Sequence, residues 1–275
     1  MKLDGFESQD SIICAIVGAT DISSSFAEWS CPQGSPASDI CRWTGIGCDS
    51  GNDVISIQFQ DVAVSGTLPS VIGYLTALTS LQFYSSSLRG TIPSTLSQAT
   101  NLQDLELQYN YLTGTLPSEL SALVNLQTMA LYLNSLVGTI PTSLTVLTNL
   151  NNFDVSVNSI SGTIPPGFGY IQNLGNLNFG MNCLGGSVPT TFGLLTNLGT
   201  LGLDGNRLTG VVPSELCLAN IGTIYLQYEG EPQNDYTCYA SCLSTVGSLW
   251  TEGTQRCTES PSLGMCIILR ICNRT

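Results

Sequence analysis

Leucine and other apolar residues recur along the chain with a period of 24 residues. The segment 102–125 reads LQDLELQYNYLTGTLPSELSALVN, and the segment 126–149 reads LQTMALYLNSLVGTIPTSLTVLTN. The same frame runs from Val54 to Asn220 in seven repeats, the last one residue short, and an eighth partial repeat starts at Ile221. In each repeat the spacing L-x-x-L-x-L predicts a short strand whose alternate side chains face a core. One repeat cannot bury its own apolar face, so the pattern predicts stacked coils.

Three further positions recur along the array and predict how the coils turn: an Asn, a Gly and, three residues after that Gly, a Pro that fixes φ and starts the convex segment, from Pro69 to Pro213. An Asn lies three residues after the strand from the third repeat onward, at Asn110, Asn134, Asn158, Asn182 and Asn206. Its amide is suited to satisfy backbone groups where the chain leaves the strand. Val62 and Ser86 replace it in the first two repeats, so we expect no such bond there. A Gly in all seven repeats, from Gly66 to Gly210, implies a backbone angle or a close approach that a Cβ atom forbids.

The full pattern L-x-x-L-x-L-x-x-N-x-L-x-G-x-[IL]-P resembles the plant-specific class of leucine-rich repeat. Trp29 and the stretch CRWTGIGC at residues 41–48 resemble the N-terminal cap of plant receptor-kinase ectodomains and polygalacturonase inhibitors. The resemblance covers roughly residues 10–226. It implies an α/β fold, a right-handed solenoid with a concave parallel β-sheet, short 3-10 or helical turns on the convex side and disulfide-capped ends. It also implies a Cys41–Cys48 bridge, and we then expect Cys14–Cys31 as the second.

We expect three regions along the chain. An N-terminal cap occupies residues 1–53, the repeat array residues 54–228, and a cysteine-rich tail residues 229–275. The apolar run Ile12–Ala19 follows acidic residues where a signal peptide would be basic, so it predicts a cap helix, and neither a leader nor a membrane anchor is recognisable.

Cysteine and charged residues narrow the function classes. Most of the eleven cysteines flank the array, which favours an oxidising compartment, and we expect a secreted or cell-surface protein. Six lie from Cys217 onward and allow 15 connectivities, and Cys183 inside the array is the candidate free thiol. The net charge of −13 with a single lysine disfavours nucleic acids and anionic membranes. Without any histidine, common nucleophile systems are excluded, and we expect no cofactor and no metal.

The candidate ligand-binding residues are those between the leucines, which we expect to face solvent on the concave sheet. Tyrosines with neighbouring amides and acids suit contact with protein or glycan, because Tyr combines apolar area with a polar tip. The alternative is that these Tyr and Gln side chains only cover the exposed face of a β-sheet and bind no ligand. The predicted site consists of Gln82, Tyr84, Asp104, Glu106, Gln108, Tyr109, Tyr132, Leu133 and Asp154.

We therefore predict an extracellular recognition module that is not an enzyme, receptor-ectodomain-like or a secreted inhibitor or defence protein. Its expected partners are a protein, a peptide or a cell-wall glycan, with a co-receptor as a further candidate. The alternatives are a structural wall or surface protein and an ice-binding solenoid, the latter because Thr follows most of the conserved glycines. A glycoside hydrolase using Asp104 and Glu106 is disfavoured, since an open sheet leaves carboxylates solvated.

Overall fold

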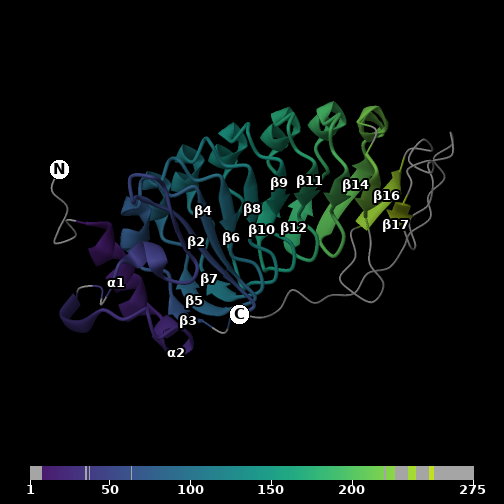
Figure 1. Cartoon of the computed structure of the whole chain (residues 1–275). Coiled ribbons are helices and arrows are strands. Elements are labelled where there is room, and N and C mark those ends of the chain that lie inside the picture. The colour runs from purple at the N-terminus through teal and green to yellow at the C-terminus, as the bar shows by residue number, and fades with distance from the viewer. Residues whose placement is uncertain are drawn as a thin grey trace. The chain divides into compact units, whose positions relative to one another are not determined.

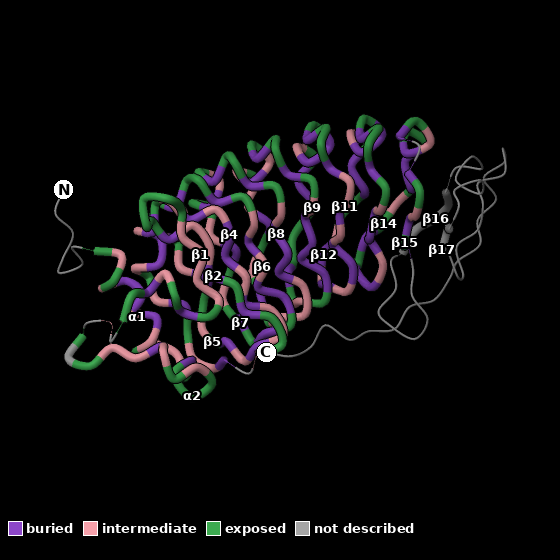
Figure 2. The backbone as a smooth tube through the Cα atoms, viewed as in Figure 1, coloured by how far each residue is buried: buried purple, intermediate pink, exposed green. Residues whose placement is uncertain are grey.

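The computed structural model describes residues 8–34, 36, 38–62, 64–219 and 221–226, and the backbone of 235–239 and 248–250 (Figure 1). The chain forms two compact units, Met1–Leu136 and Val137–Thr275. In each unit, short strands alternate with 3-10 turns, as the repeat pattern predicts. The tube in Figure 2 is purple mainly along the strands and green along the outer turns, so the core lies inside the coils.

The N-terminal unit begins with the predicted cap helix. Helix α1 spans Gln9–Ala19, and the side chain of its N-cap Ser8 accepts a hydrogen bond from the Ser11 backbone N–H. It buries Ile12, Ile13 and Ile16. A short helix α2 (Ile22–Ser25) and the 3-10 turns η1 (Pro32–Gly34) and η2 (Ile40–Arg42) complete the cap.

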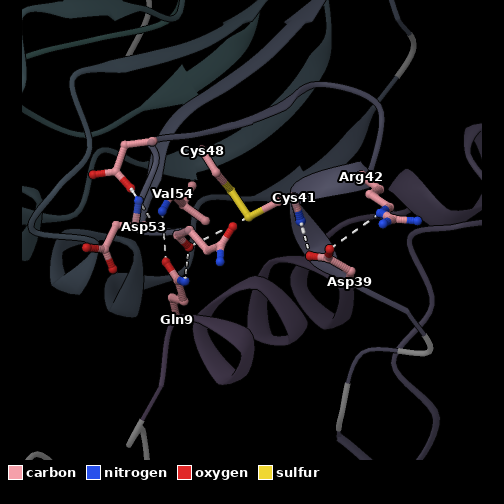
Figure 3. The surroundings of a disulfide bond; sticks show 10 residues. Gln9, Asp39, Cys41, Arg42, Cys48, Asp53 and Val54 are labelled. Carbon is pink, nitrogen blue, oxygen red and sulfur yellow. Dashed lines mark hydrogen bonds and ion pairs between the residues drawn. A yellow bond between two sulfur atoms is a disulfide. The ribbon is translucent and has the colours of Figure 1, made fainter.

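Two disulfides fix this cap: Cys41–Cys48, which the resemblance implied, and Cys14–Cys31, which we expected as the second bridge. Cys14 pairs with Cys31, and Cys41 pairs with Cys48 (Figure 3). Beside the second bridge, the Gln9 amide donates to the Asn52 carbonyl and accepts from the Val54 N–H at 2.8 Å. The start of α1 is thereby tied to the first strand of the array.

Two sheets run along the N-terminal unit. The first contains β1 (Ile46–Cys48), β2 (Val54–Gln60), β4 (Ser80–Tyr84), β6 (Asp104–Glu106) and β8 (Thr128–Ala130). Only β1 is antiparallel to its neighbour; the remaining pairs are parallel and in register at 24-residue spacing. The second sheet contains β3 (Ser65–Thr67), β5 (Ser87–Thr91) and β7 (Tyr111–Thr113). The turns η3 (Ser70–Tyr74), η4 (Ser94–Gln98) and η5 (Ser118–Ala122) each follow a conserved Pro.

The C-terminal unit repeats this arrangement. Its first sheet contains β9 (Asn152–Asp154), β11 (Asn176–Asn178), β13 (Thr200–Gly202), β15 (Thr223–Tyr225) and β17 (Ser248–Trp250). Its second contains β10 (Ser161–Thr163), β12 (Cys183–Gly186), β14 (Arg207–Val212) and β16 (Asp235–Tyr239). Along the chain, these strands alternate with the turns η6 (Thr142–Val146), η7 (Pro166–Tyr170), η8 (Thr190–Leu194) and η9 (Ser214–Leu218).

Strands β16 and β17 lie in the stretch where the sequence shows no repeat. They pair in parallel with β14 and β15 and so extend both sheets. The open edge of a parallel sheet offers backbone N–H and C=O groups that any extended segment can satisfy, with or without a leucine pattern. Cys217 is disulfide-bonded, whereas Cys183 is free. The predicted bridges of the tail otherwise lie outside the described residues.

The asparagine ladder forms as predicted. Asn182 accepts from the Ile160 N–H at 2.9 Å and donates to the carbonyls of Val155, Phe179 and Gly180. Asn110, Asn134 and Asn206 make equivalent bonds within their units. Each amide thus joins two successive coils at the point where the strand ends.

The recurring glycines share a left-handed backbone, and most of them also lie too close to a neighbouring segment for a Cβ atom. At Gly114 φ is +77°, and a Cβ atom would lie 2.7 Å from the methyl carbon of Thr91 in the preceding coil. The same contact joins Thr67 to Gly90, Thr139 to Gly162 and Thr163 to Gly186, whereas a Cβ atom at Gly210 would meet nothing within 4 Å. These contacts give the threonines a structural role in addition to their β-propensity.

Candidate functional site

The predicted binding residues of the N-terminal unit gather on three successive coils. Register pairing aligns Ser80 with Asp104, and Gln82 with Glu106, on β4 and β6. The chain continues past β6 through Gln108 and Tyr109, whose N–H donates to the Tyr132 carbonyl at 3.1 Å. We call the residues Gln82, Tyr84, Asp104, Glu106, Gln108, Tyr109, Tyr132 and Leu133 the tyrosine patch.

Two tyrosines of the patch contact each other. The rings of Tyr109 and Tyr132 meet edge to face, with centroids 5.2 Å apart. Tyr109 remains 49% exposed, while Tyr84, Tyr132 and Leu133 are half-buried. The ring pair forms a rigid aromatic surface of the kind that is enriched at protein interfaces.

Tyr109 and Leu133 occupy a backbone conformation that the sequence did not predict. Both are left-handed, with φ of 56° and 53°, and Ser85 occupies the same position one coil earlier. Non-glycine residues adopt this region at an energetic cost, which the surrounding contacts must offset. At Tyr109 the neighbouring Asn110 amide holds the turn through bonds to the Leu107 and Gln108 carbonyls.

The carboxylate of Glu106 is the centre of a polar network in the patch. Gln82 Nε2 donates to Oε1 at 3.0 Å, and Gln108 Nε2 donates to Oε2 at 3.2 Å. Asp104 lies two residues earlier on the same strand and is half-buried. The patch is therefore acidic, and its polar centre is held in place by two amides.

The structure corrects the prediction that every one of these positions faces open solvent. Gln108 is only 6% exposed, and its Oε1 atom is buried without a hydrogen-bond partner. Its equivalents in the coils before and after it are two bulky side chains, Tyr84 and Tyr132. The sequence pattern marks which face a side chain is on, but not how far its neighbours cover it.

Asp154 departs from the prediction in a second way. It lies in the C-terminal unit and is buried, accepting hydrogen bonds from the N–H and Oγ of Ser156 and from Asn178 Nδ2. Burial raises the pKa of Asp154, while these hydrogen bonds oppose the shift. The expectation that concave carboxylates stay solvated is wrong for this residue.

Asp204 is a titratable residue of the same face that sequence reasoning did not select. Burial raises the pKa of Asp204, and the negative charge of Asp154 raises it further. A Cβ atom at Gly180 would lie 2.7 Å from Asp204 Oδ1, so the missing side chain leaves room for this carboxylate. Gly180 is the signal in the sequence that could have indicated space for this carboxylate.

Comparisons with known proteins agree with this geometry. The family model described as Leucine Rich Repeat matches residues 101–123 and 149–171. No curated protein sequence matches the chain. The structure is similar to that of PEPR1 in its complex with AtPEP1, with a TM-score of 0.71 and 28% identity over 83% of this chain and 32% of that one.

Two further solved structures show the same likeness. The plant peptide hormone receptor RGFR1, in complex with RGF2, is 35% identical over 70% of this chain and 30% of that one, with a TM-score of 0.64. The Arabidopsis receptor kinase HAESA, in complex with the peptide hormone IDA and the co-receptor SERK1, is 25% identical over 88% of this chain and 44% of that one, also with a TM-score of 0.64. The chain thus spans between about a third and a half of these structures.

Repeats, cap and sheets together define the class of protein: a leucine-rich-repeat solenoid with a disulfide-fixed N-terminal cap. More particularly, it is a leucine-rich-repeat protein of the plant type, similar to the ectodomains of plant receptor kinases. Among the described residues, no helix has the length and apolarity needed to cross a membrane.

Proposed function

We propose that the protein is an extracellular recognition module that binds a peptide or protein partner through the tyrosine patch. The observation that carries this proposal is the ring pair of the exposed Tyr109 and the half-buried Tyr132 beside the acidic network around Glu106. Rigid aromatic side chains next to oriented polar groups are typical of the residues that dominate binding energy at interfaces.

The solved structures support a peptide or protein partner over a glycan. Among the structures similar to this chain are receptors in complex with peptide hormones, one of them also with a co-receptor. The two cap disulfides support secretion or display at the cell surface, because such bridges persist in oxidising compartments. Whether the protein acts as a receptor, an inhibitor or a defence protein follows from the identity of its partner.

A binding role also fits the chemistry of the patch better than catalysis does. Both Glu106 carboxylate oxygens accept hydrogen bonds from glutamine amides. These bonds engage both oxygens within the patch, whereas a general acid or base needs an oxygen that can reach the proton it transfers. We therefore assign Asp104 and Glu106 to recognition.

The test replaces the three tyrosines of the patch together. Wild-type protein is used to capture partners from the native extracellular fluid, and each purified partner is then titrated against Tyr84→Ala/Tyr109→Ala/Tyr132→Ala. We expect saturable binding that weakens by about 30-fold or more, the scale of a binding hot spot. Tyr111→Ala is the control, since Tyr111 is 54% exposed but lies on β7 in the second sheet. The proposal is contradicted if every captured partner binds the triple variant with unchanged affinity.

A further inference from the structure

The feature that calls for an explanation is the Gln108 Oε1 atom. In the part of the chain that the structure describes, it is the one buried side-chain polar atom without a hydrogen-bond partner. Buried acceptors in folded proteins are nearly always paired, because an unpaired one keeps the penalty of its lost hydration. An unpaired acceptor inside a binding surface therefore points to a donor that arrives with the ligand.

The orientation of the Gln108 amide is fixed by its neighbour. The nitrogen and oxygen of an amide are interchangeable in shape, so the network must decide between them. The Glu106 carboxylate oxygens act as hydrogen-bond acceptors, and Oε2 lies 3.2 Å from the Gln108 Nε2. The nitrogen must therefore face Glu106. The carbonyl oxygen then points away from Glu106, the residue that accepts a hydrogen bond from this side chain.

The surroundings of Gln108 supply acceptors and negative charge. Glu106 and Asp104 carry two carboxylates on one face of β6. The sole ion pair among the described residues joins Arg42 to Asp39, in the cap, so neither patch carboxylate is paired with a cation there. The missing component of this surface is a cationic hydrogen-bond donor.

The aromatic side chains narrow the identity of that donor. Tyr84 and Tyr132 occupy the positions equivalent to Gln108 in the adjacent coils, and Tyr109 packs edge to face against Tyr132. A guanidinium group is planar, stacks on tyrosine faces and has five N–H donors but no acceptor. An ammonium group is more strongly hydrated and lacks the planar stacking surface.

We propose that the tyrosine patch binds an arginine side chain of its peptide or protein partner, with the guanidinium donating to Gln108 Oε1 and to the Glu106 carboxylate. This inference rests on the proposed function and adds the chemistry of the recognised residue. Because Oε1 is buried in the free protein, the side chains that cover it must shift as the guanidinium enters. The new hydrogen bond then removes the penalty that the unpaired oxygen carries in the free state.

The test uses three short peptides as probes: Ac-Gly-Arg-Gly-NH2, its lysine counterpart and its citrulline counterpart. Citrulline keeps the length and planar shape of arginine but is neutral. Each peptide is titrated into the ¹⁵N-labelled full chain, and the shifts of the Gln108 side-chain amide and the Tyr109 backbone amide are followed by NMR. We expect saturable shifts with the arginine peptide and binding about tenfold weaker, or absent, with the other two.

A matched pair of variants tests the Gln108 side-chain amide. Gln108→Met removes the Oε1 acceptor at similar size and also gives up the Nε2 bond to Glu106, whereas Gln60→Met makes the same change at an exposed position of β2, two coils earlier in the same column. We expect Gln108→Met to lose about tenfold in affinity for the arginine peptide with at most a small loss of stability, and Gln60→Met to bind normally. Destabilisation of Gln108→Met well beyond that of one lost hydrogen bond would show that the oxygen is already satisfied inside the protein and would overturn the proposal.

The outcomes separate this inference from the proposed function. Equal binding of the arginine and citrulline peptides, or arginine binding unaffected by Gln108→Met, overturns the guanidinium assignment alone. The guanidinium assignment is also overturned if a captured partner needs the three tyrosines but not Gln108. The proposed function itself is refuted only if no captured partner loses affinity when the three tyrosines are replaced.

Discussion

The asparagine ladder allows a sharp prediction about stability, which we develop for Asn182→Ala. Asn182 is 4% exposed and makes four hydrogen bonds to the backbone of its own and the preceding coil. Its Oδ1 is the acceptor for the Ile160 N–H, which lies in a buried residue. Replacement by alanine removes all four bonds and leaves a small cavity.

The magnitude depends on which backbone groups keep another partner. The Val155 carbonyl still accepts from Asn158, the Phe179 carbonyl from Asn206, and the Gly180 carbonyl from the Val157 N–H. These three carbonyls therefore stay satisfied. The Ile160 N–H does not, and an orphaned buried donor costs about 1–3 kcal/mol. With the cavity and the lost carbonyl bonds, we expect the free energy of unfolding to fall by about 2–4 kcal/mol.

The matched control is Asn173→Ala in the same unit. Asn173 is exposed, and its side chain donates one bond, to the Thr148 carbonyl at 2.9 Å, so its replacement should cost about 0.5–1 kcal/mol. Urea unfolding followed by circular dichroism compares the two variants. Amide hydrogen exchange provides a local measurement, because the Ile160 N–H should lose its protection only in Asn182→Ala. If Asn182→Ala costs no more than Asn173→Ala, the reasoning about the orphaned donor is refuted.

Three further predictions concern the glycine ladder, the buried carboxylates and the cap. Gly114→Ala should lower the unfolding free energy by about 1–3 kcal/mol, since alanine is strained at φ +77° and its methyl group meets Thr91; a thermal melt with no shift would contradict this. Burial raises the pKa of Asp204, so the folded state binds its proton more tightly and stability falls as pH rises through the folded pKa. Asp204→Asn should therefore be more stable than wild type near pH 7 and lose this advantage below the ordinary value of 3.8, as urea midpoints across pH would reveal. Removing the Cys14–Cys31 bridge, which closes a separation of 17 residues, should destabilise the cap by about 3 kcal/mol, and equal resistance of the Cys14→Ala/Cys31→Ala variant to denaturant would speak against it.

Much of the fold was readable from the sequence because its rules are local and repeated. The leucine spacing placed the strands of the first sheet, the prolines marked the 3-10 turns, and Gly114 and its equivalents marked left-handed turns. The shortened seventh repeat also appears in the structure, where Thr200 pairs with Thr223, a spacing of 23 residues instead of 24. Strands β16 and β17 were missed, because their pairing depends on an available sheet edge and not on a leucine pattern.

The candidate site was readable only in outline. The sequence placed Tyr109, Tyr132 and Glu106 on neighbouring coils, and the structure adds the ring contact and the amide network that join them. Nothing in the sequence indicated that Gln108 is buried, because every repeat shows the same alternation of apolar and polar residues. Burial at this face depends on the size of side chains 24 residues away in either direction, which a single repeat does not encode.

The sequence by itself thus determined the coil, its turns and the face on which each side chain lies, since these follow from backbone geometry and the spacing of apolar residues. Only the tertiary structure decided which polar groups on that face are desolvated. Gln108 is covered between coils that carry tyrosines, and Asp154 lies close enough to Asp204 for their charges to interact. Both outcomes depend on contacts between coils, where the distance through space is short although the distance along the chain is long.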